Sequence, residues 1–62
     1  MNTTTRNALA DEFMDGCPEE CLEDHEIIAD AIRRGESVKT ILSMPETDRW
    51  PDTYIWLRDR LV

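Results

Sequence analysis

The sequence has no run of 18 or more apolar residues, only two glycines and only two cysteines. The first absence excludes a membrane-spanning helix, and the second leaves no glycine-rich loop to hold a phosphate. Residues 1–6 are polar and lack the apolar core of a signal peptide. We therefore expect a cytoplasmic, soluble protein without a membrane partner, in which both cysteines are free thiols.

The chain is also too short for a deep catalytic cleft beside a core. Its 62 residues allow one small domain, and such a domain buries only about 60% of the surface its unfolded chain exposes. The single histidine and the cysteines lie in an acidic segment, where negative neighbours oppose thiolate formation. We expect a binding protein that is not an enzyme and has no cofactor.

Positive charge is scarce in the first half of the sequence. Residues 1–30 contain one arginine and nine acids, a net charge of −8, whereas residues 31–62 contain six cations and five acids, a net charge of +1. The whole chain has a net charge of −7. As a whole, the protein should be repelled by nucleic acid. The difference in charge between the two halves indicates an acidic arm beside a working surface.

The pattern of apolar residues and stop signals predicts an all-α domain of three or four helices. We expect a short helix over 7–14 ending at Gly16, a longer one over 21–34 ending at Gly35, a short one over 38–43 capped by Ser37, and a last helix opening at Pro51. Residues 1–6 should be frayed, and residues 44–49 should form a turn. This organisation divides the chain into an acidic segment, 1–16, and a helix-turn-helix domain, 17–62.

The core should form from one stripe on each helix. Ile28, Ala31 and Ile32 share a face of the second helix. Thr53, Trp56 and Leu57, with Leu61, share a face of the last helix. If the N-terminal segment is ordered, its Leu9 and Phe13 should dock on this core.

Three motifs occur in order: the Gly35-Glu36-Ser37 step that follows the helix from Glu26, the Met44-Pro45 turn, and Tyr54-Ile55-Trp56-Leu57. Together they resemble the helix-turn-helix domain of the phage small-terminase type. The resemblance implies a tri-helical fold that recognises phage packaging DNA, usually as a ring-shaped homo-oligomer. Two features depart from the family pattern: the stretch from Met44-Pro45 to Trp56 is longer, and the last helix opens with Pro51-Asp52.

The first functional hypothesis is a DNA-binding module of phage type, acting in packaging or transcription control on double-stranded DNA. Lys39 and Arg49 would contact phosphates, and Arg58 a base edge or a phosphate. Thr53 and Tyr54 would add contacts. The alternative for the arginines is that Arg58 and Arg60 pair with neighbouring acids as a solvated face.

The second hypothesis is a small acidic protein that binds and inhibits a basic host protein. Acidic side chains imitate phosphates electrostatically, so such a protein could cover a basic surface that binds nucleic acid. Trp50, next to a proline, would be either a helix staple or an exposed anchor. The residues of this interface would be the acids of the first half and one tryptophan, namely Asp11, Glu12, Asp15, Glu19, Glu20, Glu23, Asp24 and Trp50.

Cys17, Cys21 and His25 recur every four residues, and thiolate and imidazole are good zinc ligands. The spacing is not that of a usual zinc finger, no fourth ligand accompanies it, and Pro18 interrupts the stripe. We therefore predict no metal site. Cys21 should instead pack as a small apolar side chain, and His25 should lie on the surface.

Overall fold

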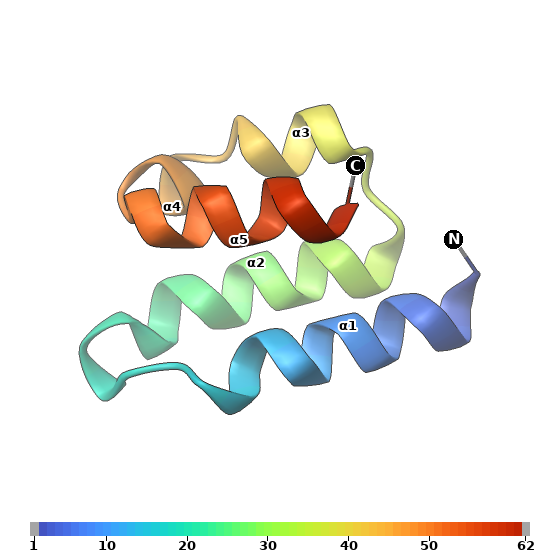
Figure 1. Cartoon of the computed structure of the whole chain (residues 1–62), viewed down its shortest axis with the longest axis horizontal. Helices are drawn as coiled ribbons and strands as arrows, with labels where there is room; N and C mark the ends of the chain where they lie inside the picture. Colours follow the sequence, from blue (N-terminus) through green and yellow to red (C-terminus); the bar gives the residue numbers. More distant parts are fainter. Residues whose placement is uncertain (1, 62) are drawn as a thin grey trace.

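The computed structural model of the chain describes residues 2–61 (Figure 1). These residues contain no strand, which confirms the all-α class. The elements are α1 (Thr3–Asp15), a 3-10 turn (Glu19–Cys21), α2 (Leu22–Arg34), α3 (Val38–Leu42), α4 (Pro45–Asp48) and α5 (Pro51–Leu61).

The helix α2 lies in the middle of the molecule (Figure 1). On one side α1 runs antiparallel to it over most of its length, and the short helices α3 and α4 contact it from the other side. The last helix, α5, packs on α3 and α4. The layer of α3, α4 and α5 therefore covers the face of α2 that α1 leaves open.

The core lies where these layers meet. Ile28 and Ile32 of α2, Ile41 of α3 and Leu57 of α5 are completely buried. Three residues of α1 complete the same cluster, namely Leu9, Ala10 and Phe13. The expected docking of the N-terminal segment is thus confirmed, and the predicted boundary between residues 16 and 17 does not divide the packing.

The helix α1 begins earlier than expected. The side chain of Asn2 accepts a hydrogen bond from the backbone N–H of Thr5 at 2.8 Å, which is a typical N-cap. The Arg6 guanidinium also donates to the carbonyl of Ile32 at 3.0 Å. Because this cap and this tether hold the first turn, the prediction of a frayed segment is wrong for residues 3–6, while Met1 lies outside the described residues.

The region predicted as one turn, residues 44–49, contains a helix. Pro45 does not only end α3: it takes the first position of α4, where its missing N–H costs nothing. The hydroxyl of Thr47 is completely buried and donates to the carbonyl of Ile41 at 2.7 Å. This bond fixes α4 against α3, a link that the sequence pattern did not reveal.

The predicted end of α2 and the predicted cap of α3 are confirmed. Gly35 has a φ of 83°, the left-handed conformation that L-residues adopt at a cost, and its N–H bonds back to α2. Ser37 then accepts a hydrogen bond from the N–H of Thr40 at 3.1 Å.

The two glycines form a matched pair for testing this account. Gly35→Ala should destabilise the fold by about 1 kcal/mol, because alanine at a positive φ is strained. Gly16→Ala should leave stability unchanged or raise it by about 0.4–1 kcal/mol, because Gly16 has a φ of −97° and open space around it. Urea unfolding followed by circular dichroism measures both, and equal effects of the two substitutions would contradict the account.

Candidate functional site

Most cationic side chains of the protein are held by its own acids or backbone. Arg6 donates to a backbone carbonyl. Five further arginines form ion pairs: Arg33 with Asp11 and Asp30, Arg34 with Glu36, Arg49 with Asp24, Arg58 with Asp59 and Arg60 with Glu12. The exposed pairs stabilise the fold little, but each reduces the positive field available to a partner.

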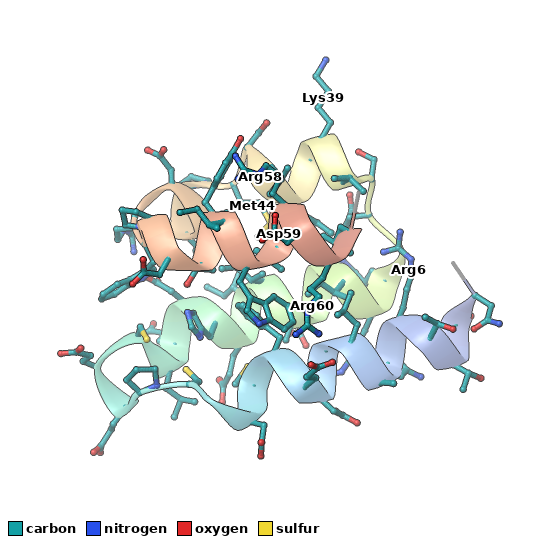
Figure 2. The ribbon with its side chains drawn as sticks, in the orientation of Figure 1. Arg6, Lys39, Met44, Arg58, Asp59 and Arg60 are labelled. Atoms are coloured by element: carbon teal, nitrogen blue, oxygen red, sulfur yellow. The ribbon has the colours of Figure 1, made fainter. Side chains whose placement is uncertain are left out.

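Lys39 differs from the other cations. All six arginines of residues 2–61 form an ion pair or a side-chain hydrogen bond, whereas Lys39 forms neither. It projects from α3 away from the other helices (Figure 2). Its charge is therefore exposed to solvent.

Negative charge without a partner gathers at one end of the molecule. Among the described residues, eight acids have no ion pair. Five of them lie between the end of α1 and the first turns of α2 and form what we call the acidic end: Asp15, Glu19, Glu20, Glu23 and Glu26. The other three are Glu46, Asp48 and Asp52. This acidic end faces the start of α5, where Asp52 and Glu20 line the same hollow.

That hollow has a volume of about 520 Å³ and aromatic walls. Phe13 of α1, Trp50 before α5 and Trp56 of α5 contribute their rings. The rings of Phe13 and Trp56 are 5.4 Å apart between centroids. Three acids also line the hollow, namely Glu12, Glu20 and Asp52. Three buried residues lie deeper in it, namely Cys21, His25 and Thr53. We call it the aromatic hollow.

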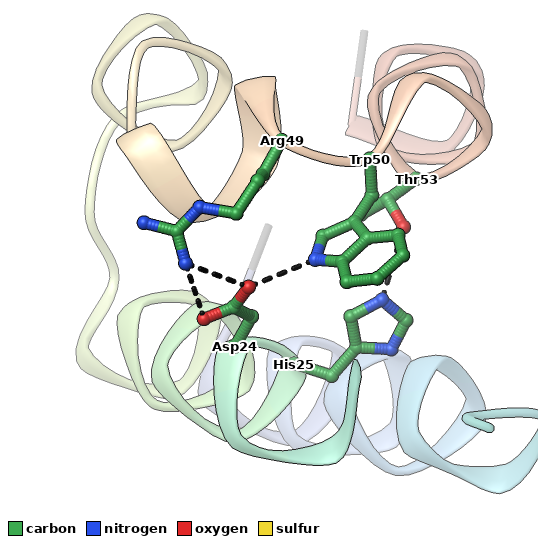
Figure 3. Close-up of polar contacts among 5 residues, drawn as sticks. All are labelled: Asp24, His25, Arg49, Trp50 and Thr53. Carbon is green, nitrogen blue, oxygen red and sulfur yellow. Dashed lines mark hydrogen bonds and ion pairs between the residues drawn. The ribbon is translucent and has the colours of Figure 1, made fainter. Parts of the chain in front are cut away.

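Asp24 holds one wall of the hollow in place (Figure 3). Its carboxylate accepts the indole N–H of Trp50 at 2.8 Å and the guanidinium of Arg49 at 2.9 Å. The hydrogen bond from Trp50, followed by the bond and charge of Arg49, lowers the pKa of Asp24 below its usual 3.8. Asp24 therefore acts as an internal clamp between α2 and the start of α5.

His25 is buried, which makes the prediction of a surface histidine wrong. Its side chain is 7% exposed and packs on Phe13 with ring centroids 4.6 Å apart. Nε2 lies 3.0 Å from the hydroxyl of Thr53 (Figure 3), whereas the buried Nδ1 has no hydrogen-bond partner. Burial lowers the pKa of His25, so the ring is neutral at pH 7.

The two cysteines are free and lie next to this histidine. Cys21 is buried, as predicted, and its Sγ is 3.9 Å from that of Cys17. Burial first, then the hydrogen bond and charge of Cys21, raise the pKa of the Cys17 thiol to about 11. A thiol with this pKa is protonated at neutral pH and is a poor nucleophile.

The predicted DNA-contact residues are not brought together on one free surface. Lys39, Tyr54 and Arg58 are exposed. Arg49 is exposed but is bound to Asp24. Thr53 is 7% exposed and bonded to His25, so its side chain offers no free surface to DNA.

The predicted partner-contact residues are closer together in space. Glu19, Glu20 and Glu23 are exposed at the acidic end, and Trp50 is a half-buried wall of the aromatic hollow. Asp24 takes a structural role instead. Glu12, one of the predicted interface acids, also lines the hollow. Sequence reasoning missed Asp52 and Trp56 as members of this site, because they come from a helix whose placement beside the acidic segment no spacing reveals.

Comparison with known proteins gave no relative: no family model, no curated protein and no solved structure matches the chain. None of the helices formed by residues 2–61 has the length and apolar character needed to cross a membrane.

The role of Asp24 can be tested with Asp24→Asn against Glu23→Gln, an exposed acid one position earlier. Asp24→Asn should lower the urea midpoint at pH 7, because it removes the anionic acceptor of Trp50 and Arg49. Glu23→Gln should have no measurable effect.

The same pair of variants gives a pH signature. The folded pKa of Asp24 is lowered, so its contribution is complete above about pH 4 and is lost as the pH falls through that lowered pKa. The difference in urea midpoint between Asp24→Asn and the unmodified chain should therefore shrink in acid. A difference that stays constant from pH 7 to pH 2 would contradict the assigned role.

Proposed function

We propose that the chain is a non-enzymatic binding protein that docks its acidic end on a basic surface of a partner protein. A lysine or arginine of the partner enters the aromatic hollow, where Glu20 and Asp52 offer carboxylates and the ring of Trp50 contacts its apolar stem or charged head. The ring of Trp56 already carries the guanidinium of Arg60 on one face, 4.8 Å from the ring centroid. The observation that carries this proposal is the position of two acids without an ion pair, Glu20 and Asp52, in a hollow walled by Phe13, Trp50 and Trp56.

Two further observations support a protein partner. First, tryptophan is enriched among the residues that dominate binding energy at protein interfaces, especially in pockets that exclude water. Second, the net charge of −7 favours rapid association with a cationic surface. If that cationic surface normally binds nucleic acid, the chain would act as its inhibitor by occupying the phosphate sites.

The proposal is tested by titrating the ¹⁵N-labelled chain with an arginine-rich peptide at low salt. The indole N–H signals of Trp50 and Trp56 should shift, and the affinity should fall as salt screens the charges. Shifts spread evenly over all exposed acids, without movement of the indole signals, would refute a specific hollow.

A pair of double variants with equal net charge separates the hollow from general acidity. Glu20→Gln with Asp52→Asn should weaken peptide binding about fivefold, as expected from about 0.5 kcal/mol for each of two exposed charge pairs. Glu26→Gln with Asp48→Asn removes the same charge from acids that do not line the hollow. It should change the affinity much less, and equal losses would contradict the proposal.

A second candidate is DNA binding, with α3 and α5 acting as the helix-turn-helix unit of phage type. It is favoured by Lys39, which projects freely from α3, and by the exposed Arg58 on α5 (Figure 2). Residues 43–50 separate these helices and include α4, whereas the usual motif has a turn of three or four residues. The exposed residues of α5 also include two acids, Asp52 and Asp59.

A gel-shift assay with duplex DNA at low salt tests this second candidate. Binding should appear at low salt, fall steeply with added salt, and weaken with Lys39→Ala or Arg58→Ala. Arg34→Ala serves as the charge-matched control, because Arg34 lies at the end of α2. The absence of any shifted band would eliminate the candidate.

A further inference from the structure

The geometry points to a metal site formed by Cys17, Cys21 and His25, which takes one thiophilic ion such as Zn²⁺ and leaves its fourth position open. This inference is independent of the proposed partner binding. It revises the expectation from the sequence, in which Pro18 broke the stripe of potential ligands.

The three ligand atoms already lie close together. The two sulfurs and one ring nitrogen of His25 are all within 4.8 Å of one another, and Sγ of Cys17 is 3.9 Å from Sγ of Cys21. Two thiolates bound to one tetrahedral zinc at about 2.3 Å stand about 3.8 Å apart. The sulfurs are therefore at ligand spacing, and small side-chain rotations would close the remaining distance to nitrogen.

The local fold explains how residues on both sides of Pro18 meet. Cys17 follows the end of α1, and Cys21 ends the 3-10 turn that Pro18 opens. The tighter turn brings Cys21 back toward Cys17, and both thiols lie within hydrogen-bond distance of the Pro18 carbonyl. His25 then follows one turn into α2. The break in the helix at Pro18 therefore brings the three side chains together, which their spacing in the sequence alone did not establish.

An independent observation concerns the buried ring of His25. Its Nδ1 has no hydrogen-bond partner although the side chain is 93% buried, since only 7% is exposed. Buried polar atoms nearly always have a hydrogen-bond partner, so a buried ring nitrogen without one requires an explanation. A metal ion bound at Nδ1 would supply that partner.

Thr53 fits the role of an outer-shell residue for this site. Its hydroxyl lies 3.0 Å from Nε2 of His25 (Figure 3). When Nε2–H donates to this oxygen, Nδ1 carries the lone pair that binds metal. Histidine ligands commonly have their second nitrogen fixed in this way by a neighbouring acceptor.

The ligand set selects the type of ion. Two sulfurs and one imidazole favour zinc and other thiophilic ions over Mg²⁺ or Ca²⁺, which prefer oxygen. Within residues 2–61, no carboxylate oxygen joins the cluster. Cys21 and His25 line the aromatic hollow, so the fourth position would open toward that space.

The test is a titration of the reduced, full chain with Co²⁺, which reports coordination by its absorption, followed by displacement with Zn²⁺. We expect thiolate charge-transfer and tetrahedral ligand-field bands, saturation at one ion per chain, and an elution volume on gel filtration that the metal does not change. Cys17→Ser and Cys21→Ser should each weaken binding at least about tenfold. The absence of these bands in excess Co²⁺, or saturation at one ion per two chains, would overturn the site.

His25 needs a separate measurement, because replacing this buried ring could unfold the protein. Addition of Zn²⁺ should move the ¹⁵N signal of its Nδ1 and leave Nε2 protonated. Thr53→Val keeps the side-chain shape and should weaken Zn²⁺ binding about tenfold while the Co²⁺ bands remain. An unmoved Nδ1 signal, or unchanged Zn²⁺ affinity in Thr53→Val, would show that His25 is not a ligand held in this way.

Discussion

Burial of the apolar face of α2 is the interaction on which the other elements depend. Ile28 and Ile32 are completely buried, and so are Ala29 and Ala31. A chain of this size has little surface to bury, and each layer must use the same central helix. For this reason α1 is part of the core: without its Phe13 and Leu9, one side of α2 would be open to water.

The small core has an electrostatic consequence. Charged side chains make up 34% of the sequence, and nearly all of them remain at the surface. Arginines of the second half pair with acids of both halves, as Arg49 does with Asp24 and Arg60 with Glu12. The positive field of residues 31–62 is thereby largely neutralised by the fold. Five of the eight acids left without an ion pair lie at the acidic end, and this uneven distribution of charge is the reason we propose a cationic partner.

The aromatic hollow and the cysteine cluster are neighbours because both arise where the α1–α2 connection meets the start of α5. Asp24 fixes Trp50 from one side, and the pair of His25 and Thr53 joins α2 to α5 behind it. A metal ion bound by Cys17, Cys21 and His25 would therefore link the α1–α2 connection to α2, beside the wall of the hollow that Trp50 forms. The two proposals concern different ligands but the same corner of the molecule.

The sequence by itself determined most of the helices and the inward faces of α2 and α5, because periodicity, Gly35, Ser37 and Pro51 act through local backbone chemistry. It missed α4 and the early start of α1, where Thr47 and Arg6 bond to carbonyls of other helices. It also placed His25 on the surface. Only the tertiary structure decided which acid pairs with which arginine, where Trp50 points and how Cys17, Cys21 and His25 meet. Those outcomes depend on distances between helices, which spacing along one chain does not encode.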